Sequence, residues 1–413
     1  MEQIQTKFRT EQSNERNQLL TPTRGIHSED FAIAKARLSY LKASINRSHQ
    51  KATVFAIAYT KPNMSVPQTQ RALLITEIGK PLTLVADRPV PQPGPNQVQI
   101  KVSIAGPNPH DQLCRDLGFF VAEFLPVAIT NDVVGTVTAL GENVAKFAVG
   151  DVVVGEANFE KGSPQNGTQE YSVLDADFTA KIPEGISPDE AATLPTNSGT
   201  AFISLFSEAN LGLPVPWASD AANFDLKTQS ILIVGGGTSC GKFGVQLASL
   251  AGLATIVVVG GPESELKSYG ATHVLDRHLP YSELLAAIRA IVGDDLVYAY
   301  DAANPPETQV LAINALSSTK RGRFARLLPI GPIDETKVNP KKEGYELCDV
   351  DGAAHGNAAV GKAYWERLPT LLSEGKIKPG RYEVAQGLDA DTWNALLDRY
   401  RDYLPVVKTH FHI

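Results

Sequence analysis

The sequence has 413 residues, which is enough for two domains that each bury a core. Its hydrophobic fraction of 43%, charged fraction of 20% and net charge of −7 are those of a globular protein without the basic face that nucleic-acid binding requires. The three cysteines form no CxxC pair, and no apolar run approaches the ~20 residues of a membrane helix, so we expect a cytoplasmic protein with no membrane partner.

Residues 1–69 read as an N-terminal extension, either mobile or draped on the body of the protein. The segment is polar, carries acids at Glu2, Glu11 and Glu15, and lacks the apolar stretch of a secretory signal. Apolar residues at helical spacing predict a short helix within residues 30–45. We expect this extension to be an accessory tail without chemistry of its own.

Short candidate strands begin after Arg71 and are divided by turn residues such as those at 91–95 and 141–143. The predicted strands are residues 72–76, 98–104, 133–138 and 151–154. Strands at this spacing indicate a partly open β-barrel.

From Gln229 onward, strands alternate with amphipathic helices. The predicted strands are residues 231–234, 254–259, 296–300 and 324–328. Apolar stripes at helical spacing lie at residues 243–250 and 284–292, and Pro305-Pro306 opens a further helix. This α/β rhythm predicts a Rossmann-type, doubly wound parallel sheet.

A glycine-rich turn, residues 235–241, follows the first of these strands. Glycines let a backbone approach a pyrophosphate, and the next helix offers free N–H groups at its N-terminus. The turn departs from the pattern GxGxxG because Cys240 stands where the third glycine would fall, so the strand before it and the helix after it carry the interpretation. The expected cofactor-binding residues here are Gly235, Gly237, Thr238, Ser239, Cys240 and Gly241, and the alternative is a purely structural turn.

The end of the second strand bears on which dinucleotide binds. NAD enzymes commonly place an acid there for the ribose 2′-hydroxyl, whereas this strand ends in Gly260-Gly261-Pro262. Lys267 and Arg277 follow and could reach a 2′-phosphate, so the sequence favours NADPH. Ile330 and Gly331, which follow the strand at 324–328, complete the expected cofactor-binding set.

Several blocks in a fixed order resemble the medium-chain dehydrogenase/reductase superfamily over residues 70–413. They are the glycine-rich turn and residues 105–111, 149–151, 167–171, 191–195, 270–272 and 406–411. Within the superfamily the chain is similar to a zinc-free branch of fungal enoyl-reductase-like and quinone-oxidoreductase-like proteins. The resemblance implies a GroES-like catalytic domain at 70–195, a Rossmann NADPH-binding domain at 196–350, and a C-terminal return to the catalytic domain at 351–413.

The sequence differs from the zinc-dependent members at two positions that bind the metal in those proteins. Those members carry Cys where this chain has Asn108, and a Gly-His-Glu block where it has Thr130-Asn131-Asp132. Because Asn is a poor zinc ligand, we expect no metal. Without a Lewis acid, the expected substrate is already electron-poor, since an enolate formed by hydride addition needs only hydrogen-bond donors and a proton.

Four residues are the candidate catalytic groups. By resemblance, Asn108 lies in the cleft as a hydrogen-bond donor and Thr200 faces the nicotinamide. The proton donor is left open between His110, which is close to Asn108 in sequence, and His355, with Tyr171 and bulk water as further alternatives.

The substrate pocket has weaker signals. Phe119, Phe120 and Phe124 either line an apolar cleft or pack under the barrel. Trp217 lies in a long segment, residues 211–226, that is either a lid or a linker.

Three functions fit the sequence. The first is an NADPH-dependent oxidoreductase that transfers hydride to a carbonyl-conjugated C=C or a quinone without a metal, acting as a monomer or homodimer. The second is a trans-acting enoyl reductase of a polyketide-type pathway, whose partner is an acyl carrier protein. The third is a non-catalytic nucleotide-binding protein of the same fold.

Overall fold

The structure is a computed structural model that describes residues 66–219, 221–327 and 331–413. The chain divides into two compact units after Ser65, and every described residue belongs to the second unit, Val66–Ile413. The helix expected within residues 30–45 and the cofactor candidate Ile330 therefore lie outside the described residues.

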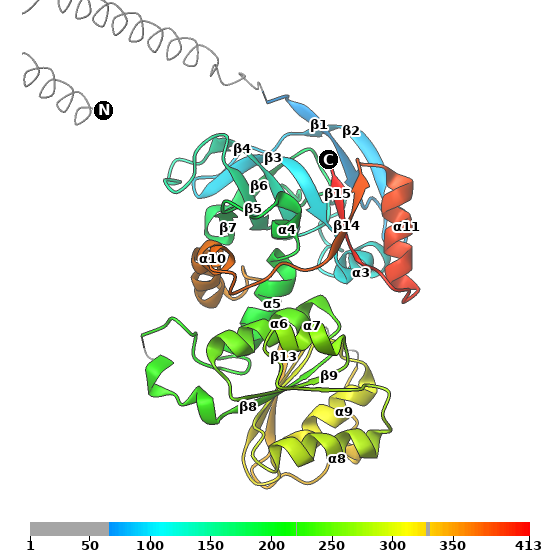
Figure 1. The fold of residues 1–413 in the computed structure, drawn as a ribbon. Coiled ribbons are helices and arrows are strands. Elements are labelled where there is room, and N and C mark those ends of the chain that lie inside the picture. Colours follow the sequence, from blue (N-terminus) through cyan, green and yellow to red (C-terminus); the bar gives the residue numbers. More distant parts are fainter. Residues whose placement is uncertain (1–65, 220, 328–330) are drawn as a thin grey trace, which may run out of the picture. The chain divides into compact units, whose positions relative to one another are not determined.

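The first domain is built on a seven-stranded sheet with the strand order β14-β15-β3-β4-β5-β7, in which β6 also pairs with β3 (Figure 1). Its strands are β3 (Gln97–Gly106), β4 (Asp132–Leu140), β5 (Val152–Glu156), β6 (Tyr171–Asp175), β7 (Thr179–Lys181), β14 (Tyr382–Gln386) and β15 (Lys408–His412). A separate antiparallel pair, β1 (Thr69–Leu74) and β2 (Thr83–Pro89), lies beside it. The C-terminal strands thus join the sheet formed by residues 97–181, because β15 pairs with β3.

Four helices of more than one turn accompany this sheet within the described residues: α3 (Pro109–Leu117), α4 (Pro188–Ala192), α10 (Ala358–Ser373) and α11 (Ala390–Arg401). The helix α3 begins where β3 ends, and Pro109 at its first position fits a site whose backbone N–H has no intrahelical acceptor. This junction between β3 and α3 contains Asn108 and His110, so local structure fixes where both candidates lie.

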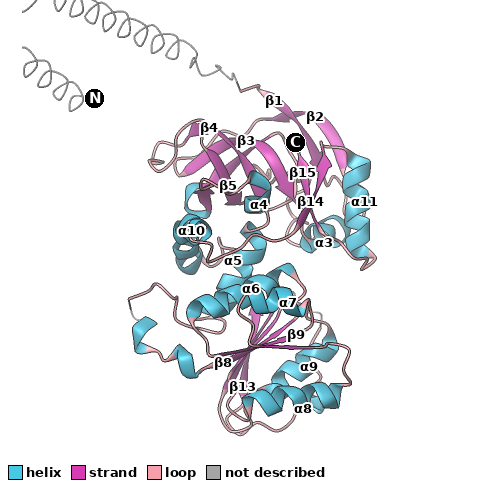
Figure 2. Ribbon diagram, viewed as in Figure 1, coloured by secondary structure: helices cyan, strands magenta, loops and turns pink. Residues whose placement is uncertain are grey.

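The second domain contains a six-stranded parallel sheet with the order β10-β9-β8-β11-β12-β13 (Figure 2). Its strands are β8 (Ser230–Val234), β9 (Thr255–Val259), β10 (His273–Leu275), β11 (Tyr298–Asp301), β12 (Gly322–Leu327) and β13 (Tyr345–Val350). Strand order reverses between β8 and β11, and open parallel sheets bind ligands at such a point, beyond the carboxyl ends of the strands.

Helices cover both faces of this sheet. They are α5 (Pro195–Phe206), α6 (Ser239–Ala251), α7 (Glu263–Ser268), α8 (Tyr281–Val292) and α9 (Pro306–Ala315). Successive strand residues pack on opposite sides: Ile231 and Ile233 share a core with α6, whereas Leu232 and Val234 share one with α8 and α9. Such continuous burial explains the unbroken apolar run of β8. The predicted fold, a GroES-like barrel domain plus a Rossmann domain, is confirmed.

The long segment before β8 is attached to the core. Trp217 packs on Phe202 of α5, with ring centroids 5.5 Å apart and planes 19° from parallel. This contact favours a fixed linker over a lid. Across the described residues, no helix combines the length and apolarity needed to span a bilayer.

Candidate active site

The glycine-rich turn between β8 and α6 is packed so closely that it admits no side chains at two positions. A Cβ on Gly235, whose φ is +81°, would lie 2.6 Å from the Cβ of Ala303, and a Cβ on Gly241 would lie 2.2 Å from the carbonyl oxygen of Gly235. Thr238 caps α6, since its Oγ1 accepts the N–H of Gly241 at 2.9 Å. The first-turn amides of Ser239 and Cys240 have no preceding helical carbonyl to pair with, which suits an anion.

The tip of β9 packs against the same turn. Gly260 and Gly261 have φ angles of +77° and +98°, and a Cβ on Gly261 would lie 2.6 Å from the backbone nitrogen of Gly237. Any side chain at position 261 would therefore displace the turn. Arg277 lies beside this tip, because its Cδ is 3.3 Å from the position of a Cβ on Gly260, and its side chain is exposed.

The two other cofactor candidates that the structure describes lie apart from this tip contact. Lys267 forms an exposed ion pair with Glu263 at 2.7 Å. Gly331 is exposed, has a φ of +77°, and accepts a hydrogen bond from Nη1 of Arg326 at 3.2 Å through its carbonyl.

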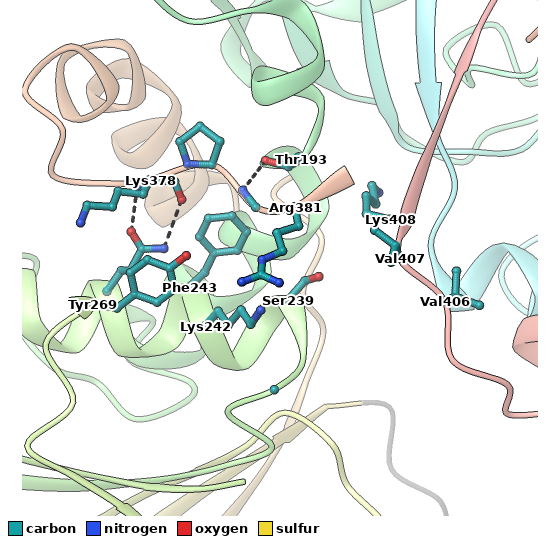
Figure 3. Close-up of a pocket in the computed structure, with 14 residues that line it drawn as sticks. Thr193, Ser239, Lys242, Phe243, Tyr269, Lys378, Arg381, Val406, Val407 and Lys408 are labelled. Atoms are coloured by element: carbon teal, nitrogen blue, oxygen red, sulfur yellow. Dashed lines mark hydrogen bonds between the residues drawn. The ribbon is translucent and has the colours of Figure 1, made fainter. Parts of the chain in front are cut away.

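A cavity borders the N-terminus of α6, and Figure 3 shows the side chains around it. Lys242, in the first turn of α6, and Arg381, from the segment before β14, both lie near Ser239 (Figure 3). Both cations are close to one carboxylate: Nζ of Lys242 lies 2.9 Å and Nε of Arg381 lies 3.7 Å from Glu265. Lys242 had a sequence signal, since it directly follows Gly241, whereas Arg381 had none.

A buried polar network surrounds Asn108 at the end of β3. Its Nδ2 donates to Oδ2 of Asp132 at 2.9 Å, and its Oδ1 accepts from Nζ of Lys408 at 2.8 Å and from Nδ2 of Asn197 at 3.0 Å. Lys408 also donates to the carbonyl of Gly106 at 2.7 Å and forms an ion pair with Asp132. All three hydrogens of the ammonium group therefore have acceptors. The four network side chains Asn108, Asp132, Asn197 and Lys408 are buried.

Charge holds this network together. Burial raises the pKa of Asp132, but the charge and hydrogen bond of Lys408, with further hydrogen bonds from Thr196 and Asn108, outweigh it and place the pKa below its ordinary value. Asp132 is thus an anion in a fully buried position, and Lys408 is its counter-ion. Sequence reasoning missed Lys408 as a functional residue, although it lies in one of the matched blocks.

Cys240 joins the glycine-rich turn to this network. Its thiol donates to Oδ1 of Asn197 at 3.4 Å, and Asn197 in turn donates to Asn108. Burial raises the pKa of Cys240 to about 12, so the sulfur keeps the hydrogen that it donates. The residue that broke the glycine pattern therefore contacts Asn197, whose bond to Asn108 connects the two domains.

His110 lies next to the network and is fixed by Asn131. Nε2 of His110 is 2.9 Å from Oδ1 of Asn131, whose Nδ2 donates to the carbonyl of Ala157 at 2.5 Å. Because that amide hydrogen identifies Oδ1 as the acceptor, Nε2 of His110 carries a hydrogen. Among the described residues no hydrogen-bond partner is found for Nδ1, which leaves this nitrogen to exchange a proton.

The remaining candidates are not joined to this network. Thr200 is buried and its Oγ1 donates to the carbonyl of Gly352 at 3.3 Å. His355 is 3.0 Å from Oδ2 of Asp175 and packs on the ring of Phe178, with centroids 4.2 Å apart. Tyr171 is buried in the barrel. The structure therefore joins Asn108 to the turn through Asn197, binds the nearby His110 to Asn131, and places His355 in a different set of contacts.

Sequence reasoning also missed a buried carboxyl group at the end of β5. Glu156 accepts the N–H of Ala354 at 2.9 Å through Oε1, and its Oε2 would lie 3.2 Å from a Cβ on Gly199. Burial, together with the charge of Asp132, raises the pKa of Glu156 to about 8 despite the hydrogen bond from Ala354.

The geometry joins the glycine-rich turn to a buried polar network through Cys240 and Asn197, and comparisons with known proteins identify the family. Residues 94–184 match the alcohol dehydrogenase GroES-like domain family. Dehydrogenase orsE of Emericella nidulans is 32% identical over 341 residues, covering 78% of this chain and 93% of that protein. The chain belongs to the medium-chain dehydrogenase/reductase superfamily, as the sequence blocks predicted.

Two further comparisons extend this result. The trans-enoyl reductase himH of Aspergillus japonicus is 29% identical over 311 residues, covering 71% of this chain and 85% of that protein. A mycobacterial protein solved in complex with NADPH superposes with a TM-score of 0.64 at 22% identity, covering 83% of this chain and 100% of that chain. At this identity the second likeness concerns the fold.

Proposed function

We propose that this protein is an NADPH-dependent reductase that transfers hydride, without a metal, to a C=C conjugated with a carbonyl or to a quinone. The observation that carries the proposal is the hydrogen-bonded path from Cys240 through Asn197 and Asn108 to Lys408 and Asp132. It links the nucleotide turn to a site that, in zinc-dependent relatives, is built from metal ligands.

The residues present do not fit zinc. An ammonium group lies 2.8 Å from Oδ1 of Asn108, the atom that would have to ligate the metal, and repels a second cation. The other position, Asn131, uses its amide oxygen for His110 and its amide nitrogen for Ala157. Among residues 66–219, 221–327 and 331–413, moreover, no group of three or more His, Cys, Asp or Glu side chains is arranged to hold a metal ion.

Three features support NADPH as the cofactor. The turn exposes first-turn amides for a pyrophosphate, with Lys242 and Arg381 beside them (Figure 3). The tip of β9 carries glycines where NAD enzymes commonly place an acid, and Arg277 lies beside that tip. A structural neighbour was solved in complex with NADPH.

When bound, NADPH supplies the hydride. The amides of Ser239 and Cys240 would hold the pyrophosphate, and Arg277 would pair with the 2′-phosphate. The imidazolium form of His110 would give its Nδ1 proton to the enolate and become the neutral imidazole, while Asn131 holds the ring in place by the bond to Nε2. Bulk water then restores the proton on His110.

Asn108 contributes by holding its amide group in a fixed orientation. Its amide nitrogen already donates to Asp132 at 2.9 Å and to the carbonyl of Gly106 at 3.4 Å. It donates to a substrate oxygen only by releasing the longer of these bonds. Lys408 holds the opposite end of the amide, so the pair fixes the direction in which Asn108 presents its N–H groups.

A screen of NADPH oxidation against enones, quinones and enoyl thioesters tests the proposal. We expect turnover with at least one class of acceptor and none with simple alcohols and NADP⁺. Tight NADPH binding without any turnover would indicate the non-catalytic nucleotide-binding alternative instead.

The second candidate function is a trans-acting enoyl reductase of a polyketide-type pathway. The observation in its favour is the similarity to trans-enoyl reductase himH. Here the substrate is an acyl chain on a carrier protein. Comparing kcat/KM for the same enoyl group as a free thioester and on an acyl carrier protein separates the two, because only a trans-acting enzyme gains from the carrier.

A further inference from the structure

Two phenylalanine side chains at the end of α3 are exposed. Phe119 is 39% and Phe120 is 53% exposed, whereas Phe124, the third residue of the same sequence group, packs against the barrel core. Exposed aromatic rings that touch one another commonly mark a binding surface. The rings of Phe119 and Phe120 have centroids 4.0 Å apart.

The two rings continue into the candidate site. Phe120 stacks on Phe159 at 5.9 Å with an interplanar angle of 22°, and Phe159 meets the ring of His110 edge-on at 6.1 Å. We call Phe119, Phe120 and Phe159 the aromatic row. It leads from the imidazole at the site to the surface, over residues from two separate segments of the barrel domain.

Hydrogen bonds hold this row in place. Asn131, which binds His110, also exchanges two bonds with Ala157, two residues before Phe159. Arg88 binds further along the same segment, donating to the carbonyl of Ser163 at 3.1 Å and to its Oγ at 2.8 Å. The position of Phe159 relative to His110 is therefore fixed by the partner that also fixes the imidazole.

The backbone of Phe120 is strained, and its ring is exposed. Its φ is +65°, a region that bulky side chains rarely adopt, and such outliers cluster at ligand-binding sites. The turn is held by bonds from the amides of Val121 and Ala122 to the carbonyl of Gly118, at 3.0 and 2.9 Å. Val121, the next residue, is fully buried, and its packing holds the strained backbone of Phe120 in place.

We propose that the aromatic row binds the apolar substituent of the substrate, so that the protein acts on conjugated carbonyl compounds carrying an extended alkyl or aryl group. The inference rests on the function proposed above, since it places the reacting carbonyl near His110. The exposed surface of the two rings is roughly 200 Å². This area suits a hydrocarbon chain but is far below the ~800 Å² that each partner buries in a stable protein interface.

The test measures affinity without turnover. The full-length protein, with and without saturating NADPH, is titrated with the saturated methyl ketones 2-butanone and 2-decanone by calorimetry. We expect 2-decanone to bind at least about 100-fold more tightly than 2-butanone, because its six additional methylene groups move from water onto the aromatic row. Phe120→Asn, which keeps a residue suited to the left-handed backbone, and Phe159→Ala should each cut this ratio at least tenfold.

The matched control is Leu84→Ala, which removes an apolar side chain that is 46% exposed on β2. It should leave the ratio unchanged. An equal ratio in the wild type and both row variants would overturn the inference, as would dissociation of a wild-type dimer by Phe120→Asn with the ratio intact. If only the proposed function fails, the protein should not oxidise NADPH, while the ratio of its affinities for 2-decanone and 2-butanone should stay as expected.

Discussion

The glycine-rich turn and the Asn108 network lie at one site but are built in opposite ways. The turn is built from backbone, and Gly235, Gly236 and Gly241 tolerate no side chain because an added Cβ would lie 2.2 to 2.6 Å from its nearest neighbouring atom. The network consists of side chains, and Lys408 meets Asn108 across 300 residues of sequence. The packing of the turn is therefore sensitive to side-chain volume, and the stability of the network is sensitive to side-chain charge.

The largest effect is expected from breaking the charge balance of the network. Lys408→Met leaves Asp132 as a buried anion without its counter-ion, which should lower the free energy of unfolding by about 3–5 kcal/mol. Denaturant unfolding of the full chain measures this. The double variant Lys408→Met/Asp132→Asn should recover at least half of the loss, and equal stability of the single variant and the wild type would contradict the account.

The turn can be broken by charge without breaking its packing. A Cβ on Gly237 meets only Gly261, at 3.3 Å, so Gly237→Asp places a carboxylate beside the expected phosphates while the chain still folds. NADPH affinity should fall at least 100-fold, or ~2.7 kcal/mol, by charge repulsion. The control Gly237→Ala should lose less than tenfold, and equal losses in both would point to a steric effect. Gly241 is less suitable, because any side chain there meets the turn itself.

The preference between NADPH and NADH provides a second test of the region around the turn. Arg277→Ala should lower the affinity for NADPH about tenfold, or ~1.4 kcal/mol, and leave that for NADH unchanged. Lys267→Ala is the matched control, since Lys267 is paired with Glu263, and it should have a smaller effect. Cofactor fluorescence titrations measure both, and an identical loss for NADH would remove Arg277 from the 2′-phosphate site.

The smallest effect concerns the buried carboxyl next to the network. The pKa of Glu156 is about 8, above its ordinary value of 4.5, so the folded state retains a proton that the unfolded state has released. The free energy of unfolding therefore falls as the pH rises through this window, by about 1 kcal/mol between pH 7 and 8. Glu156→Gln should show no such fall, and parallel pH profiles of variant and wild type would contradict the assignment.

Local pattern was enough to predict the fold and the turn. The run of apolar residues at β8, the glycines after it and the acid-free tip of β9 all lie within about thirty residues, and each follows from short-range geometry. Strand ends were displaced by a few residues, as at β1, which begins at Thr69 and ends at Leu74, because the residues at strand ends pair with distant partners.

The network could not be predicted in this way. Lys408 reads as an ordinary charged residue until β15 pairs with β3 and brings it to Asp132. His355 and His110 looked alike in sequence, and only tertiary contacts give the first Asp175 and the second Asn131 as partners. Glu156 carried no sequence signal, since its raised pKa arises from burial.

The most direct test of metal-free hydride transfer uses NADPH deuterated at C4 of the nicotinamide, with protein that has been treated with a chelator and checked by elemental analysis. An enone that supports turnover is the acceptor, and mass spectrometry locates the label in the product. Metal-free hydride transfer to the β-carbon should give one deuterium on that carbon of the saturated ketone at an undiminished rate. Deuterium at the carbonyl carbon, or activity lost to the chelator and restored by zinc, would contradict it.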